Sequence, residues 1–174
     1  MRILRNLIFL IVFPVFLVSC GASRRSKNLA KAPEVELRTT PQIEPADDKI
    51  YKVVQNAKSF EGTPYKYGGT SKRGMDCSGL IYTSYLEEDI PLPRTSRAMS
   101  HQGKRLYLKE VTIGDLLFFQ TNKNKEVINH VGMVVDVLPK EILFIHSTTS
   151  GGVIISSLSE KYWFGRFVMA RRPI

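Results

Sequence analysis

The chain has 174 residues, enough for one ordinary domain and too few for two. Its apolar content of 43% is typical of a globular core and excludes a largely disordered chain. Two cysteines exclude a disulfide framework, and the formal charge of +9 is spread over scattered basic residues. That charge suits an anionic cell envelope at least as well as nucleic acid, and we expect no nucleic-acid partner.

The first segment has the pattern of an export signal. Two arginines precede a short apolar run over residues 7–18, which is shorter than the roughly 18–20 residues that span a bilayer. The following LVSCG resembles the bacterial lipoprotein box, in which the cysteine is lipidated and becomes the new N-terminus. We therefore expect a lipoprotein signal peptide over residues 1–19 and a lipid on Cys20. An ordinary signal peptide that happens to contain cysteine is the alternative.

Residues 20–46 are expected to form a tether. They lack apolar periodicity and carry three prolines, which is typical of a flexible linker between the lipid and a domain over residues 47–174. Lipidation of Cys20 would leave Cys77 as the one free thiol of an exported protein. Such a thiol cannot be locked into an intramolecular disulfide, and this suits a nucleophile.

Helices are predicted in the first half of the domain. A helix is expected over residues 47–60, because apolar residues recur there at i, i+3, i+4 and i+7. The stretch GTPYKYGGTSKRG is expected to be a loop or an irregular strand. Further helices are expected over residues 77–88 and, more briefly, over residues 95–101.

Strands are predicted in the second half. Short β-rich runs separated by turn residues are DLLFFQ, HVGMVVDVL, EILFIHST, GVIISS and RFVMARR. Helices come first and strands follow, so the sequence predicts an α+β fold. In this fold the N-terminal helices pack on an antiparallel sheet of about five to six strands.

Cys77 lies where the Gly-rich stretch gives way to the second predicted helix. A helix N-terminus lowers the pKa of a thiol from about 8.5 and offers N–H groups to an oxyanion. Gly79 would permit the close approach of a substrate or another chain. A packed core cysteine is the alternative, but the polar or small neighbours Asp76, Ser78 and Gly79 do not favour it.

A cysteine nucleophile needs a base, and two of the three histidines lie in a predicted hairpin. A three-residue turn would place His130 and His146 on one face, about 7 Å apart, whereas an even turn would separate them. Their pairing therefore requires an odd turn or a β-bulge. In that register His130 accepts the proton of Cys77, and His146 fixes the tautomer of His130. Structural histidines are the alternative, and His101 is expected on the surface.

A zinc site is the competing use of cysteine and histidine. Positions 77, 130 and 146 contain no paired ligand motif such as C-x-x-C or H-x-x-x-H. We therefore expect no metal and no organic cofactor.

Five blocks of the sequence occur in the order GTPYKYGGTSKRGMDCSG, LPRTS, GDLLFF, HVGMVV and IHSTTSGGVIISS. In this order they resemble the NlpC-type family of bacterial cell-wall cysteine peptidases, which are papain-like in fold. The resemblance spans about residues 47–172 and is closest to lipoprotein members that act as murein endopeptidases. It implies that Cys77 is the nucleophile, His130 the base and His146 the third polar residue.

The resemblance also extends to residues around the thiol. It implies that Tyr65 lies beside the sulfur, as an oxyanion donor or as part of the substrate site. Asp76 and Ser78 match the motif as well, and we expect Asp76 to be structural, accepting loop N–H groups. Arg94 and Arg97 could pair with substrate carboxylates, although a solvated surface role is the expectation.

The implied reaction is hydrolysis of an amide bond in peptidoglycan stem peptides through a thioester, between γ-linked D-glutamate and a diamino acid. The implied protein is a monomer in the bacterial cell envelope, anchored through Cys20 to a membrane, with the outer membrane favoured. An amidase or acyltransferase on the same scaffold is one alternative. A non-catalytic wall-binding lipoprotein is the other.

Overall fold

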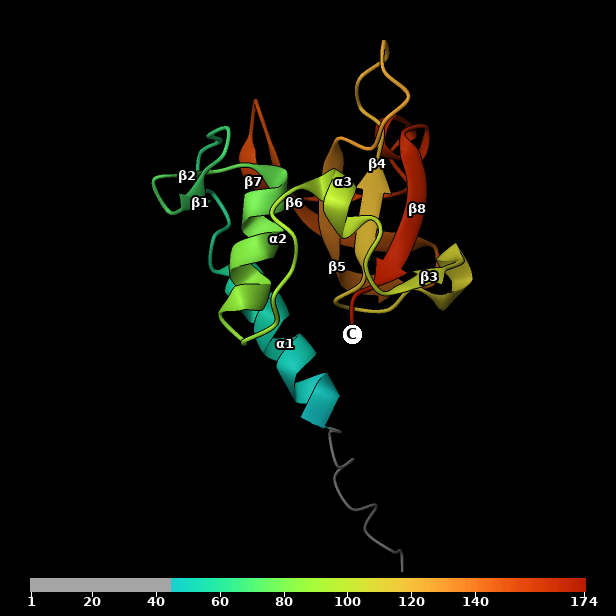
Figure 1. Cartoon of the computed structure of the whole chain (residues 1–174). Helices are drawn as coiled ribbons and strands as arrows, with labels where there is room; N and C mark the ends of the chain where they lie inside the picture. The colour runs from blue at the N-terminus through green and yellow to red at the C-terminus, as the bar shows by residue number, and fades with distance from the viewer. Residues whose placement is uncertain (1–44) are drawn as a thin grey trace, which may run out of the picture. The chain divides into compact units, whose positions relative to one another are not determined.

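The structure is a computed structural model and describes residues 45–174 (Figure 1). The expected signal peptide, the lipidation at Cys20 and nearly all of the tether lie outside the described residues. Within residues 45–174, no helix has the length and apolar character needed to cross a bilayer.

The helices form near their predicted positions. They are α1 (Pro45–Lys58), α2 (Cys77–Leu86) and α3 (Ser96–Met99). Asp76 begins α2 by accepting the N–H of Gly79 at 2.6 Å, as an N-cap residue does. The helix ends two residues before the expected position, shortly ahead of Asp89, which has a left-handed φ of 58°.

Six antiparallel strands form the main sheet, in the order β3-β8-β4-β5-β6-β7. The five predicted runs correspond to β4 through β8, so the α+β prediction is confirmed. The remaining strand, β3, has three residues and is too short to show alternation. The bounds are β3 (Lys104–Leu106), β4 (Leu116–Phe119), β5 (His130–Leu138), β6 (Glu141–Thr148), β7 (Gly152–Ser157) and β8 (Phe167–Arg172).

Four further short elements are present. The Gly-rich stretch holds a small hairpin of β1 (Thr70–Ser71) and β2 (Gly74–Met75). The 3-10 helix η1 (Leu108–Glu110) and the single-turn helix α4 (Lys161–Phe164) were not predicted, because elements this short show no period.

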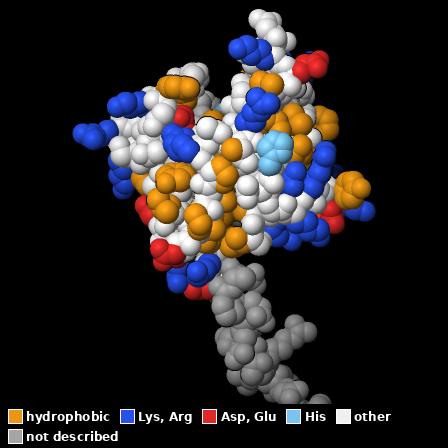
Figure 2. Space-filling view, in the orientation of Figure 1, with side chains coloured by type: hydrophobic (Ala, Val, Ile, Leu, Met, Phe, Trp, Pro, Cys, Tyr) orange, Lys and Arg blue, Asp and Glu red, His pale blue; other side chains and the backbone are white. Residues whose placement is uncertain are grey.

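The sheet is buried on both faces. Helices α1 and α2 cover one face, where Val53, Leu80 and Met133 belong to one apolar cluster (Figure 1). On the other face, α4 inserts Trp163 against Phe119 and neighbouring apolar residues. This double burial explains why β4 is a continuous apolar run rather than an alternating one. Outside these cores, Figure 2 shows Lys and Arg side chains dispersed over the displayed face.

The register between β5 and β6 depends on a β-bulge. Leu138 pairs with Glu141, so the turn has two residues, an even number that by itself would separate the two histidines. A bulge between Val134 and Asp136 then shifts the pairing by one residue. Beyond the bulge, residues pair as a three-residue turn would have paired them. The requirement for an odd turn or a bulge is therefore met by the bulge.

Candidate active site

Cys77 is the first residue of α2 and lines two cavities. It is a free thiol with 9% of its surface exposed. Tyr65, Cys77 and Asn129 line both cavities, which have volumes of about 370 and 560 Å³. The two cavities thus share three lining residues, one of which is the free cysteine.

The Gly-rich loop packs directly on the first turn of α2. A Cβ atom at Gly79 would collide with the backbone carbonyl oxygen of Gly69. The close approach predicted at Gly79 is therefore made by the chain's own loop. This contact holds Tyr65, which bridges to Met75, beside the helix that carries the thiol.

His130 and His146 form a buried pair on one face of the sheet. His130 Nε2 lies 3.0 Å from His146 Nδ1, and the rings are nearly perpendicular at 88°. His130 also lines the smaller of the two cavities, together with Cys77. Because Nε2 of His130 is engaged by His146, Nδ1 is the ring nitrogen of His130 that does not contact His146.

Two side chains that the sequence analysis did not single out complete the pair. His146 Nε2 lies 2.9 Å from Ser156 Oγ on β7. Trp163 stacks on His130 at 5.3 Å and 20°, and meets His146 edge-on at 4.5 Å. Trp163 is the one tryptophan of the chain, and this was the feature of the sequence that could have drawn attention to it. Nothing local distinguishes Ser156 from the neighbouring serine.

Burial determines the resting protonation state of these groups. It raises the pKa of the Cys77 thiol to about 11, although the backbone N–H of Val131 acts in the opposite direction. Burial also lowers the pKa of His130 to about 4 and, with the His130 charge, that of His146 to about 3. The lowered thiol pKa expected from the helix N-terminus is therefore not found. These directions favour the neutral forms of the thiol and of the imidazole that lines the same cavity.

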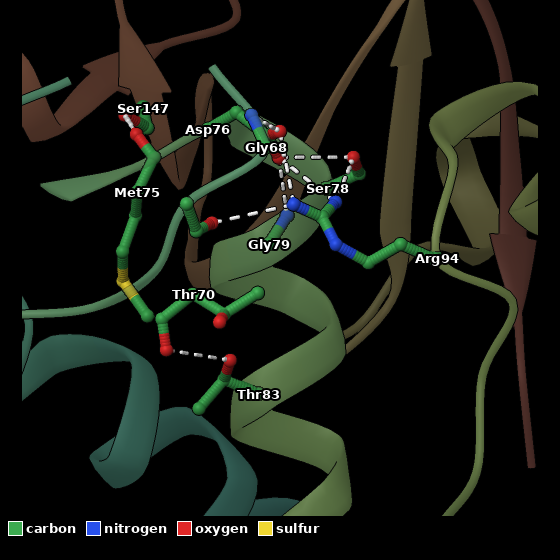
Figure 3. A network of polar contacts seen from close by, with 10 residues as sticks. Gly68, Thr70, Met75, Asp76, Ser78, Gly79, Thr83, Arg94 and Ser147 are labelled. Carbon is green, nitrogen blue, oxygen red and sulfur yellow. Dashed lines mark hydrogen bonds and ion pairs between the residues drawn. The ribbon is translucent and has the colours of Figure 1, made fainter. Parts of the chain in front are cut away.

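Asp76 organises the start of α2 (Figure 3). Its carboxylate accepts the N–H groups of Gly79 and Gly68 at 2.6 and 2.7 Å, as the expected structural role requires. The Arg94 guanidinium donates to both carboxylate oxygens at 3.0 Å, and to Ser78 Oγ at 2.8 Å. Burial disfavours the charge on Asp76, but Arg94 and the N–H groups outweigh it, so its pKa is lowered.

Arg94 therefore has a role that the sequence analysis did not predict. Arg94 makes a bidentate contact with Asp76. This contact is neither the solvated surface role that was expected nor a pairing with a substrate carboxylate. Arg97 and His101 are exposed, and neither lines the two cavities at Cys77. Among the described residues, no three His, Cys, Asp or Glu side chains gather as metal ligands would.

Sequence comparisons place this site in a known family. The model of the NlpC/P60 family matches residues 62–172. A probable endopeptidase NlpC homolog of Haemophilus influenzae is 38% identical over 79% of this chain and 69% of that protein. The probable endopeptidase NlpC of Escherichia coli is 35% identical over 82% and 87%. The Escherichia coli protein named murein DD-endopeptidase MepS/murein LD-carboxypeptidase is 29% identical over 94% and 89%.

Solved structures agree with the sequence relatives. A crystal structure of a NlpC/P60 family protein from Bacillus cereus matches with a TM-score of 0.64 and 31% identity, over 71% of this chain and 40% of that one. A similar-to-lipoprotein NLP/P60 structure from Staphylococcus aureus has a TM-score of 0.65 and 30% identity, over 78% and 45%. This chain thus spans less than half of either. These matches confirm the papain-like fold, and the chain belongs to the NlpC/P60 family of cysteine peptidases.

Proposed function

We propose that this chain is a cysteine endopeptidase that hydrolyses an amide bond in peptidoglycan stem peptides through a thioester intermediate. The observation that carries the proposal is that Cys77 and His130 line one cavity while His146 engages the far nitrogen of the His130 ring. The names of two relatives support the substrate class, since one is named a murein DD-endopeptidase and the Bacillus subtilis protein LytE a probable peptidoglycan endopeptidase.

Acylation begins from the neutral thiol. His130 Nδ1 accepts the Cys77 proton as the sulfur attacks the amide carbon, which forms the C–S bond and a tetrahedral oxyanion. N–H groups in the first turn of α2 and the Tyr65 hydroxyl are the donors proposed for this oxyanion. The imidazolium of His130 then donates its proton to the leaving amine, and the C–N bond breaks to leave the thioester.

Deacylation uses the same groups in reverse. A water molecule gives a proton to His130 Nδ1 and attacks the thioester carbon, and the released sulfur recovers the proton. The burial that raises the thiol pKa keeps the resting site uncharged, so charge appears only when the substrate is in place. No step requires a metal or an organic cofactor.

For the scissile bond, we propose the amide between γ-linked D-glutamate and a diamino acid. The names of the relatives indicate different specificities, since MepS is named a DD-endopeptidase and Bacillus subtilis CwlT a DL-endopeptidase. Defined muropeptides that each contain one of these bonds separate the possibilities. The new termini, identified by mass spectrometry, report which bond is cut.

The test compares the wild-type chain with Cys77→Ala and Cys77→Ser on purified muropeptides. We expect both variants to lose about a thousandfold or more of the cleavage rate and to keep the wild-type melting temperature within a few degrees. Ser157→Ala removes a hydroxyl of β7 that contacts Ser159 at the surface. This control variant should cleave at the wild-type rate. Full wall cleavage by Cys77→Ala would overturn the peptidase proposal.

The competing activities give other products in the same assay. An amidase would release intact stem peptides from the glycan, and an acyltransferase would form a new amide when an amine acceptor is added. A non-catalytic wall-binding protein would retain muropeptides without changing their masses. The buried pair of His130 and His146 beside a free thiol favours hydrolysis over mere binding.

We also propose that Cys20 is lipidated after removal of residues 1–19 and that the protein is a monomer in the bacterial envelope, with the outer membrane favoured. Residues 20–46 would then link the lipid to the peptidase domain. Growth with labelled palmitate tests the anchor. Label should enter the wild-type chain and be absent from Cys20→Ala, whereas equal labelling of the two would exclude Cys20.

A further inference from the structure

The nitrogen of His146 that faces away from His130 is bonded to a serine. His146 is completely buried, and its Nε2 lies 2.9 Å from Ser156 Oγ. Ser156 is itself buried, on the neighbouring strand β7, and this is its one side-chain hydrogen bond in the described structure. The register explains the contact, because His146 pairs with Ile154 and Ser156 lies two residues further along the same face.

Three side chains thus form one hydrogen-bonded line, from Ser156 through His146 to His130. Each neutral imidazole carries one N–H proton, so the protons of the two rings can be arranged along this line in two ways. In the first, both rings carry the proton on Nε2, so that His146 donates to Ser156 and His130 donates to His146. In the second, both rings carry it on Nδ1, and Ser156 donates to His146.

Only the first arrangement leaves a base for the thiol. With both protons on Nε2, the Nδ1 atom of His130 has a free lone pair that can accept the proton of Cys77. With both protons on Nδ1, the same atom is already protonated. The choice is therefore made at the end of the line, where Ser156 either accepts from or donates to His146.

We propose that Ser156 is a positioning residue of this peptidase, which accepts the Nε2–H of His146 and so holds both imidazole rings in the tautomer that lets His130 act as a base. The inference rests on the proposed cysteine-peptidase function and adds a fourth member to its machinery. Without Ser156, a buried N–H of His146 would lose its partner, which favours the opposite tautomer of both rings.

NMR of the histidine rings tests the line without any substrate. Long-range proton–nitrogen correlations of protein labelled with nitrogen-15 histidine distinguish Nε2–H from Nδ1–H rings. Wild type should show Nε2–H in both His130 and His146, and Ser156→Ala should gain the Nδ1–H form. Nδ1–H rings in wild type, or an unchanged spectrum in Ser156→Ala, would overturn the inference. The muropeptide test measures cleavage itself, so failure of this inference and failure of the proposed function are distinguished by different readouts.

Kinetics supply the second test. Ser156→Ala should lower kcat about tenfold with little change in KM, because the substrate contacts remain while the competent tautomer becomes scarce. Ser156→Thr, which keeps the hydroxyl, should recover most of kcat, and Ser157→Ala on the opposite face should match wild type. A kcat for Ser156→Ala within twofold of wild type would contradict the proposal.

The pH profile separates positioning from simple loosening of the site. The titratable group against His146 is His130 on β5, while Trp163 of α4 and Phe144 of β6 carry no charge. Loss of the Ser156 acceptor should move the acidic limb of kcat/KM in Ser156→Ala to lower pH, because the imidazolium formed during the reaction is less stabilised. A loosened, hydrated site would move this limb upward, which would contradict a positioning role.

Discussion

His130 Nε2 and His146 Nδ1 lie 3.0 Å apart because a bulge corrects the hairpin that carries them. With a two-residue turn and no bulge, the two rings would point to opposite faces of the sheet. The bulge between Val134 and Asp136 is therefore a condition for the candidate site and not a local irregularity.

The buried histidine pair should make stability depend on pH. The folded-state pKa values of His130 and His146 lie below the ordinary value of 6.5, at about 4 and about 3. As pH falls below 6.5, the unfolded chain binds protons that the folded protein excludes, so stability is full above 6.5 and is lost toward pH 4. Each ring would contribute a loss of up to about 1.4 kcal/mol per pH unit in this window.

Urea unfolding at pH 7.5 and at pH 5.5 measures this dependence. The exposed His101 provides the control, because His101→Gln should keep the wild-type difference between the two pH values. His146→Asn should reduce the difference. A protein equally stable at both pH values would show that the rings are not held neutral by burial.

Trp163 should keep the pKa of His130 low by covering its ring. In Trp163→Ala, water would reach the ring and raise its pKa toward 6.5, so the acidic limb of kcat/KM should move up by about one pH unit or more. Trp163→Phe should retain most of the wild-type profile. Phe164→Ala, which alters the adjacent exposed ring of α4, is the control. An unmoved limb in Trp163→Ala would refute this role.

Arg94 should stabilise the segment that carries the thiol. Removing the guanidinium in Arg94→Ala leaves the Asp76 carboxylate without its charged partner. We expect the free energy of unfolding to fall by about 2 kcal/mol, which is less than for a fully buried pair because Arg94 is partly exposed. Activity should fall as well, because Asp76 caps the helix of Cys77. Arg97→Ala, which changes an exposed arginine nearby, should stay within about 0.5 kcal/mol of wild type in urea. Equal stability of the two variants would contradict the argument.

A second ion pair should affect stability without affecting catalysis. Arg172 donates to both oxygens of Asp115 at 2.8 Å, and Asp115 is 2% exposed. Arg172→Ala should therefore cost about 2 kcal/mol in urea unfolding. Neither residue lines the cavities at Cys77, so kcat on muropeptides should be unchanged. Arg105→Ala, at an exposed position of the adjacent strand, should change neither quantity.

The local features of the site were predictable from sequence because short-range rules govern them. The end of the Gly-rich stretch indicated a helix start at Cys77, and β-rich runs indicated five of the six strands of the main sheet. The family motifs identified Cys77, His130 and His146 as the candidate site, and the family assignment is confirmed.

What sequence alone determined is therefore the family, the α+β class and the candidate residues Cys77, His130 and His146. Tertiary structure decided how these residues are placed. The bulge that pairs the histidines, the contact of Arg94 with Asp76, the cover supplied by Trp163 and the hydroxyl of Ser156 all depend on how separate elements pack together. Burial then reversed the expected direction of the thiol pKa, because desolvation depends on the whole surrounding fold, which no local pattern reports.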